Sequence, residues 1–293
     1  MLTNKHFNAL IIAVVTALFV ISCGPGIKVA KNKPFLDANA LVGQGRYAEA
    51  LDIYMAHKGV IAWDSISLRN ATIAASETNH DSLAAVWGFL YPSTADTLKL
   101  KSLGNSLKRL GRDEERTNLI LSNENTFTYI LGNVEIQNVK ARFYAQNNDD
   151  RLLDLYPTLS DNTVKAEVFD TFYKKAQSQL TAKDLEKHCV DILKSTPNQT
   201  TALMHMGRSK YKQAETKYAS AMDDYNKKKS QAAYAYLTRD LKKYVTPLYK
   251  ESRTYFEKLL KLDSKDKTIV KYLININDRL NNQDEVKRLK KLL

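Results

Sequence analysis

One short pattern of glycine, small and aromatic residues constrains the fold of this chain more than any other feature. In the stretch LVGQGRYAEALDIYMAH, residues 41–57, Gly45 stands two positions before Tyr47, and Ala50 stands four before Tyr54. Residues four apart lie on one face of an α-helix, so Ala50 and Tyr54 would face the same neighbour. Glycine between two such segments marks a turn. The stretch therefore predicts two helices joined by a tight turn.

Weaker versions of this pattern follow along the rest of the chain. They share a glycine or alanine where two helices would cross or turn, or an aromatic residue four positions after a small one. These positions are Gly104, Gly111, Ala141, Gly207 and Phe256. Gly45 and Gly111 are 66 residues apart, which is about two lengths of a 34-residue repeat. The spacing indicates a chain built from repeated helix pairs.

Together with Ala38, these residues resemble the tetratricopeptide repeat, a helix–turn–helix unit of about 34 residues. In that unit a small residue lies where the first helix meets the second, and Gly or Asn marks the turn. The resemblance covers roughly residues 34–293. It implies an all-α fold, a right-handed superhelical solenoid of helix hairpins, because one pair cannot bury its apolar face alone. It also implies a concave groove that binds extended peptides or partner helices.

The composition agrees with a helical globular chain. The 293 residues include only 10 Gly and 6 Pro, which argues against a loop-rich β fold, and 44% of the residues are hydrophobic. The 16 tyrosines stand mostly at packing positions of the repeat, so we expect most of them in the core. The alternative is that they stack on glycans or peptides.

The C-terminal region departs from the repeat length. From Thr200 to Asp263 the chain runs for 64 residues where one unit of about 34 is expected, and turn signals are nearly absent. We therefore expect an elongated C-terminal helix pair with a polar joint at residues 226–230. This separates repeats at residues 34–199 from a C-terminal part at residues 200–293 with lengthened helices.

The polar joint reads NKKKS and supplies a candidate partner surface made of Lys227, Lys228 and Lys229. Three adjacent cations near the end of a helix pair would be solvent-exposed and accessible to an acidic partner. The alternative is an elongated pair that only caps the solenoid.

The first 33 residues read as a targeting segment and a tether. After Lys5, residues 9–21 form the run ALIIAVVTALFVI. Its length fits the apolar core of a secretory signal, about 7–15 residues, and is short for a membrane span of about 20. The residues Val-Ile-Ser-Cys that end at Cys23 resemble the lipobox of bacterial lipoproteins. Alternatives are an ordinary signal peptide with a nearby cysteine, or a single anchoring helix.

The lipobox resemblance implies a signal peptide at residues 1–22, cleavage before Cys23, and acylation of its thiol and new amino group, with palmitate among the chains. Residues 23–33 would then form the acylated cysteine and a flexible tether. By the sorting logic of Gram-negative lipoproteins, Gly24 in place of Asp favours the outer membrane. The absence of an acidic cluster after Cys23 favours a domain that faces the periplasm.

The positive charge is concentrated at one end of the chain. The formal net charge is +12, and residues 200–293 carry 22 Lys and Arg against 11 Asp and Glu. A basic surface suits nucleic acid, anionic lipid headgroups or an acidic protein. No motif of a nucleic-acid fold is present, and an exported protein does not normally meet nucleic acid, so we expect no such partner. A purely solubilising surface is the alternative.

The sequence shows little catalytic chemistry. The histidines are scattered without the spacing of a metal site, and phosphate-binding and nucleophile-elbow motifs are absent, so we predict no metal, no cofactor and no enzyme activity. His188 and Cys189 are adjacent, which would point them about 100° apart on a helix rather than pair them. Cys189 is expected to be a small buried hydrophobe, since no second cysteine remains after Cys23 for an internal disulfide.

These features resemble tetratricopeptide lipoproteins of Gram-negative bacteria. The function they predict is a membrane-anchored, non-enzymatic scaffold or adaptor that binds protein partners in an envelope assembly. The alternative is capture of a glycan or nutrient for an outer-membrane importer, which predicts aromatic residues exposed on a concave face. An enzyme without a recognisable motif would instead require titratable side chains clustered in a cleft.

Overall fold

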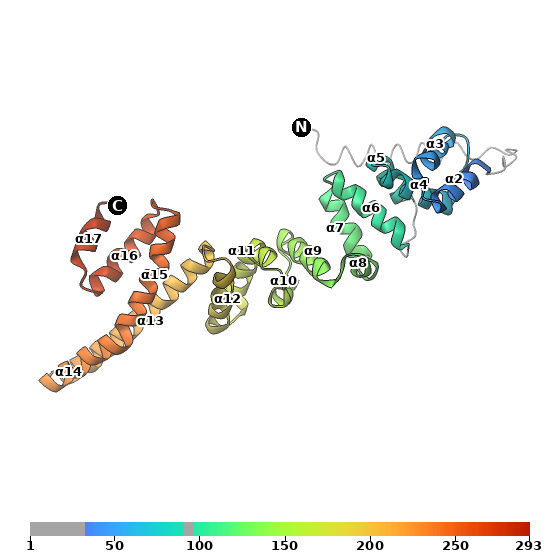
Figure 1. The fold of residues 1–293 in the computed structure, drawn as a ribbon. Helices are drawn as coiled ribbons and strands as arrows, with labels where there is room; N and C mark the ends of the chain where they lie inside the picture. Colours follow the sequence, from blue (N-terminus) through green and yellow to red (C-terminus); the bar gives the residue numbers. More distant parts are fainter. Residues whose placement is uncertain (1–32, 91–95) are drawn as a thin grey trace. The chain divides into compact units, whose positions relative to one another are not determined.

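A computed structural model describes residues 33–90 and 96–293 of the chain (Figure 1). Cys23, the predicted signal peptide and nearly all of the predicted tether lie outside the described residues. All regular elements in the described part are helices, which confirms the predicted all-α helical repeat fold. The chain divides into two compact units, the first ending at Ile130 and the second spanning Leu131–Leu293. The boundary predicted after residue 199 falls inside the second unit and stays a prediction.

In the first unit most helices pack on the next one along the chain, and the first helix of a pair also packs on the first helix of the following pair. Its helices are α2 (Lys33–Gly43), α3 (Tyr47–His57), α4 (Ser65–Glu77), α5 (Asp81–Leu90), α6 (Thr97–Arg109), α7 (Asp113–Ser122) and α8 (Glu124–Leu131). Helix α4, for example, contacts α2 and α6 as well as α3 and α5. Aromatic rings fill the core of the first pairs, where Trp63 lies 4.5 Å from Phe35 and 5.3 Å from Trp87 between ring centroids. Each pair thus buries its apolar face against a neighbour.

The second unit continues with α9 (Asn133–Gln146), α10 (Arg151–Leu155), the 3₁₀ turn η2 (Tyr156–Thr158), α11 (Asn162–Gln179), α12 (Ala182–Ser195), α13 (Thr200–Lys227), α14 (Gln231–Asp240), the π-helical turn η3 (Leu241–Val245), α15 (Thr246–Leu262), α16 (Lys267–Arg279) and α17 (Gln283–Lys290). One core gathers around Phe169 and Phe172 of α11, and another around Phe256 of α15 and Leu273 of α16. Sequential packing of short amphipathic helices therefore builds this unit as well.

The same turn recurs at the end of the first helix of a pair. After α2, Gly45 adopts φ +74°, its N–H donates to the Val42 carbonyl, and the next N–H, of Arg46, donates to the Leu41 carbonyl. This is the Schellman arrangement, which needs a left-handed residue after the helix. Four further turns have the same two bonds and a left-handed residue, namely those at Asn79, Gly111, Asn148 and Asn281. Asparagine tolerates this backbone region better than other non-glycine residues.

The elongated C-terminal pair is confirmed. Helix α13 has 28 residues, and its partner runs from Gln231 through α14, η3 and α15 to Leu262 without a loop. Ser230 begins that partner, because its side chain accepts from the Ala233 N–H. The π turn precedes Pro247, and there the Thr246 N–H donates to the carbonyl of Leu241, five residues back. Since proline has no N–H to continue the α pattern, a wider turn at this point fits the sequence.

The two long helices cross closely at Gly207. Ser252 donates from its hydroxyl to the Gly207 carbonyl at 2.7 Å, and both groups are buried. A Cβ atom at position 207 would lie 3.0 Å from the Cζ atom of Phe256, which is tighter than nine in ten real contacts of a Cβ atom. Glycine at this crossing therefore lets the ring of Phe256 pack against the backbone of α13.

We predict that Gly207→Ala lowers the free energy of unfolding by about 1–3 kcal/mol, because the added methyl group overpacks the contact with Phe256. Faster amide hydrogen exchange in α13 and α15, read by mass spectrometry of the whole chain, measures the loss. Gly43→Ala is the control, since nothing lies within 4 Å of its added Cβ. Equal protection in both variants would show that the crossing tolerates a methyl group.

Candidate interaction surface

The repeat positions singled out in the sequence are buried or form turns, so they build the fold rather than a binding surface. Ala38, Ala50 and Tyr54 are fully buried in one core of the first unit, and Tyr54 donates from its hydroxyl to Asn39 Oδ1 at 2.6 Å. Tyr47 begins α3 and packs at the edge of the same core. These side chains hold the helix pairs together and leave binding to other residues.

The remaining repeat positions also have packing or turn roles. Ala141 and Phe256 are fully buried. Gly104 faces the ring of Phe127, since a Cβ there would lie 3.3 Å from the ring edge. Gly111 occupies the left-handed position of its turn, with φ +66°.

In the second unit His188 and His205 each contact an aromatic ring, and Cys189 belongs to a hydrophobic core. Cys189 is fully buried, and burial raises the pKa of its thiol to about 12, so it stays protonated near neutral pH. His188 meets the ring of Phe172 edge-on at 5.1 Å between centroids, and burial lowers the pKa of its imidazole. His205 Nδ1 lies 2.9 Å from the Tyr173 hydroxyl. The structure does not bring these groups together as a nucleophile and its base.

The described residues offer neither a metal site nor a membrane-spanning helix. Across residues 33–90 and 96–293, no group of three or more His, Cys, Asp or Glu side chains is arranged to hold a metal ion. Within the same ranges, no helix combines the length and the apolar character that a membrane crossing requires.

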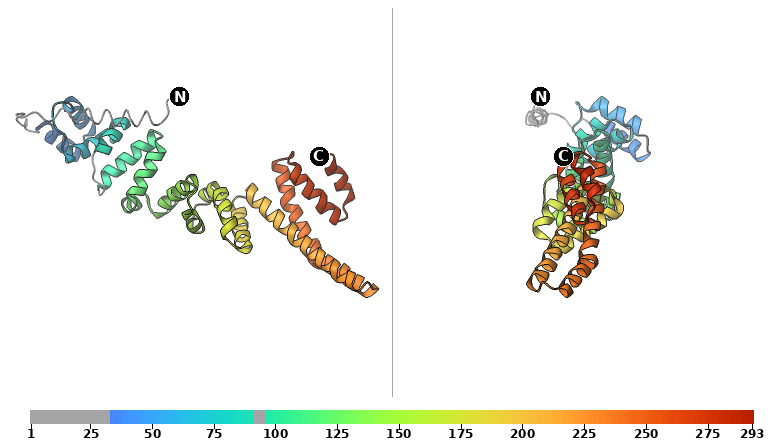
Figure 2. Two further views of the ribbon diagram at one scale, coloured as in Figure 1. Left: turned by 180° about the vertical axis from the view of Figure 1, so that it is seen from behind. Right: turned by 90° about the vertical axis from the view of Figure 1, so that its left-hand side faces the viewer.

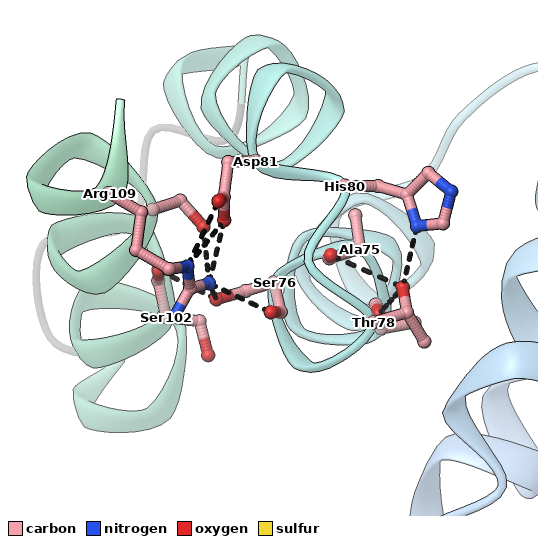
Figure 3. Close-up of polar contacts among 9 residues, drawn as sticks. Ala75, Ser76, Thr78, His80, Asp81, Ser102 and Arg109 are labelled. Carbon is pink, nitrogen blue, oxygen red and sulfur yellow. Dashed lines mark hydrogen bonds and ion pairs between the residues drawn. The ribbon is translucent and has the colours of Figure 1, made fainter. Parts of the chain in front are cut away.

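A polar network ties three helices of the first unit together (Figure 3). Arg109, the last residue of α6, donates from Nε to Asp81 Oδ2 at 2.9 Å and from Nη2 to Asp81 Oδ1 at 2.6 Å. The same Nη2 donates to the Ser76 carbonyl at 2.8 Å, at the C-terminal end of α4. Hydrogen bonds from Arg109 hold the pKa of the Asp81 carboxyl below its usual value. This guanidinium thus satisfies a helix-end carbonyl and an acid that begins α5.

A second polar network lies between the long C-terminal helices and α16. Glu215 accepts from the Tyr249 hydroxyl at 2.6 Å and from Arg279 Nη2 at 3.1 Å. Arg279 also lies over the ring of Tyr218, 4.3 Å from its centroid. Burial raises the pKa of Glu215, but these hydrogen bonds outweigh it and hold the pKa below its usual value. The network joins α13, α15 and α16 just before the long pair leaves the core.

Beyond Glu215 the long helix pair projects from the second unit, and we call residues 216–245 the arm (Figures 1 and 2). In the arm only Leu237 and Val245 are buried. The arm carries seven Lys and Arg against three Asp. Its cations Lys227, Lys228 and Lys229 lie exposed at the tip, where α13 ends. A helix pair of this length exceeds what its core packing requires.

Three tyrosines of the arm are exposed rather than buried. Tyr234 and Tyr236 are each 59% exposed and Tyr244 is 45% exposed, although most tyrosines were expected in the core. Arg239 lies over the ring of Tyr236 at 4.8 Å from its centroid. Lys243 and Lys217 lie 4.9 and 5.5 Å from the centroid of Tyr244. The sequence held a signal for this surface, because residues two apart on a helix cannot both face one core.

Several solved structures are similar to this chain, among them two TPR repeat proteins. One is a TPR repeats protein from Bacteroides fragilis, at 14% identity and a TM-score of 0.31, with 86% of this chain and 99% of that chain covered. The other is the C-terminal part of a TPR repeat-containing protein from Cytophaga hutchinsonii, at 16% identity and a TM-score of 0.31, with 82% and 99% covered. No family model matches the sequence, and no curated protein matches it. The helical-repeat fold rests on the turns and helix pairs of the chain itself.

We predict that Arg109→Met destabilises the first unit by about 1.5–3 kcal/mol at pH 7, because a mostly buried carboxylate and a helix-end carbonyl both lose their donor. We expect this loss of stability to be smaller in acid. The pKa of the Asp81 carboxyl is lower in the folded state than in the unfolded chain. Its contribution to the free energy of unfolding is therefore present above the unfolded-state pKa and disappears as the pH falls through the folded-state pKa.

Urea unfolding followed by tryptophan fluorescence, at pH 7 and pH 3, measures this effect, since both tryptophans, Trp63 and Trp87, lie in the first unit. Arg46→Met is the matched control, because the ion pair of Arg46 with Glu49 is more than half exposed on both sides and contributes little. Equal loss of stability in both variants would contradict a structural role for the Arg109 network.

Proposed function

We propose that this chain is a membrane-anchored, non-enzymatic scaffold or adaptor that mediates protein–protein interactions in an envelope assembly. The observation that carries the proposal is the arm, residues 216–245, which extends beyond the core and exposes cations and tyrosines. Helical repeat proteins characteristically bind partners through surfaces that their stacked pairs present. The packing of the repeat positions in the core leaves the arm as the surface with no evident structural task.

The anchored location is supported by the first residues of the sequence. The apolar run, the lipobox-like residues that end at Cys23, and Gly24 after the cysteine favour an outer-membrane lipoprotein that faces the periplasm. Two or more acyl chains hold a protein on a membrane stably, since each buried CH₂ contributes about 0.8 kcal/mol. The tether at residues 24–33 would let the folded units reach partners near the membrane.

A second candidate function is capture of a glycan or nutrient for an outer-membrane importer. The exposed rings of Tyr234 and Tyr236 favour it, because aromatic faces stack on sugar rings. Arg239 lies over Tyr236, whereas Tyr234 contacts the ring of Tyr225. Both exposed rings stand on a projecting helix rather than in an enclosed site, which fits a protein partner better. We therefore propose the scaffold function, and its test must distinguish that function from ligand capture.

We predict that Cys23→Ser removes the protein from the membrane fraction and abolishes palmitate incorporation, because the thiol that carries the acyl chain is lost. Fractionation and metabolic labelling of cells that express each form measure this. Cys189→Ser is the control, since that thiol is buried in α12 and is not expected to be acylated. Unchanged membrane association of the Cys23→Ser form would contradict lipid anchoring.

The scaffold itself is tested by affinity purification of the wild-type protein from crosslinked envelopes. A defined set of envelope proteins, recovered with wild type and reduced with the detached Cys23→Ser form, is the expected result. Recovery of a glycan or small ligand without any enriched protein would contradict the scaffold and favour ligand capture.

A further inference from the structure

We infer that the arm binds an acidic segment of a protein partner through cations and tyrosines on the outer side of α14 and η3. This inference rests on the proposed scaffold function and names the surface and the chemistry of its partner. The inferred surface lies on α14 and η3 and adds to Lys227, Lys228 and Lys229 at the tip; Figure 2 shows the course of the helix pair that carries it.

The surface is a row of exposed side chains along one side of a helix. Tyr236, Arg239 and Lys243 follow at i, i+3 and i+7, and all three are exposed. Tyr236 and Arg239 are three residues apart in α14, which places them on the same side of that helix. Lys243 follows four residues later, about one turn further along, in the wider π turn η3. The opposite side carries Leu237 and Val245, the two buried residues of the arm. The row is therefore the face that the helix pair leaves unpaired.

Cations beside the rings fix how the tyrosines are presented. Arg239 lies over Tyr236, and Tyr244 is flanked by Lys243 on its own helix and by Lys217 on α13. A cation over a ring face is attracted by the negative potential of that face. The rings thus stay beside positive charge instead of packing into the core, and a partner meets both at once.

Most cations of the arm are not paired with an acidic side chain of the described residues. Lys227 pairs with Asp224 at 3.2 Å and Arg239 with Asp240 at 3.4 Å, and all four groups are exposed to solvent. Among the described residues, Lys228, Lys229 and Lys242 have no acidic partner within ion-pair distance. Exposed pairs contribute little to stability, so a carboxylate of a partner can replace them at small cost. The net excess of positive charge selects a negatively charged partner.

The exposed apolar side chains of the arm are of a type that favours binding to a protein over binding to a membrane surface. Between Thr200 and Lys261, the exposed large hydrophobic residues are Tyr234, Tyr236 and Tyr244, all of them tyrosines. A helix that lies in a lipid interface inserts Leu, Phe or Trp, which this row lacks. Tyrosine and arginine are instead the residues enriched at the energetic centres of protein interfaces. The row therefore fits a segment that offers carboxylates together with some apolar contact.

The first test uses the purified protein and a defined probe. The probe is a fluorescein-labelled peptide of 20 residues with Glu and Leu at amphipathic helical spacing, and its comparison peptide has Gln in place of each Glu. We expect the Glu peptide to bind, and the combined change Tyr236→Ala, Arg239→Glu and Lys243→Glu to weaken binding by at least about tenfold, measured by fluorescence anisotropy. Rising salt should weaken the wild-type complex.

A matched control separates a specific surface from general basicity. Lys287→Glu and Lys290→Glu reverse two exposed cations at the end of α17, and Tyr129→Ala removes a ring that is 85% exposed in the first unit. This control makes the same change of charge and aromatic content outside the arm. Equal weakening in the arm variant and the control would overturn the inference. Circular dichroism checks that both retain their helices.

The second test identifies the natural partner chemistry in the cell. A photo-crosslinking phenylalanine analogue replaces Tyr236 in the full-length protein, and crosslinked peptides are sequenced by mass spectrometry. Adducts rich in Asp and Glu from one protein are the expected result. Adducts to phospholipid, or binding of phosphatidylglycerol vesicles or an oligonucleotide that depends on the arm, would overturn it. Envelope proteins recovered equally by wild type and the arm variant would overturn the inference while the scaffold function stands.

Discussion

The left-handed residue that ends the first helix of a pair is the constraint on which the rest of the structure depends. It lets two backbone N–H groups turn back onto the last carbonyls of the helix, and the chain reverses direction within a few residues. The five turns of this kind are those at Gly45, Asn79, Gly111, Asn148 and Asn281. Each turn packs a short helix against the helix before it. Part of the apolar surface of that pair stays uncovered, and the next pair packs on it. Stacking follows from that uncovered surface, and cores such as the one around Phe35 and Trp87 are its result.

Close packing between pairs is secured by small residues and by polar contacts at helix ends. Gly207 admits the ring of Phe256, and Ser252 binds the backbone at the same crossing. Arg109 performs a different task, since it satisfies a terminal carbonyl of α4 and the first acid of α5. These contacts lie inside the stack. In the arm only Leu237 and Val245 are buried, and Tyr218 and Leu241 pack against the core with part of their surface exposed. The exposed residues of the arm can therefore serve a partner without loss of core packing.

The sequence predicted the fold class well because repeat spacing and glycine turns are local signals. It also predicted the long C-terminal pair, since a stretch without turn residues has no place to end a helix before 226–230. The turns at Asn79 and Asn281 were missed because asparagine is common in many other settings. The Arg109–Asp81 pair joins residues 28 positions apart, which no local pattern reveals. Exposure of Tyr234 and Tyr236 was missed because the tyrosines were assigned to packing positions as a group, although two residues that are two apart on a helix cannot both face one core.

The base of the arm explains how a surface far from the core can still bind with precision. Glu215 receives hydrogen bonds from Tyr249 and Arg279, so three helices are joined where the arm begins. From that point two helices support each other along the arm, with Leu237 and Val245 between them. A pair held in this way loses less conformational freedom on binding than an isolated helix would. Affinity then depends on the charge and the rings that the arm presents, and these belong to a few exposed positions that packing does not constrain.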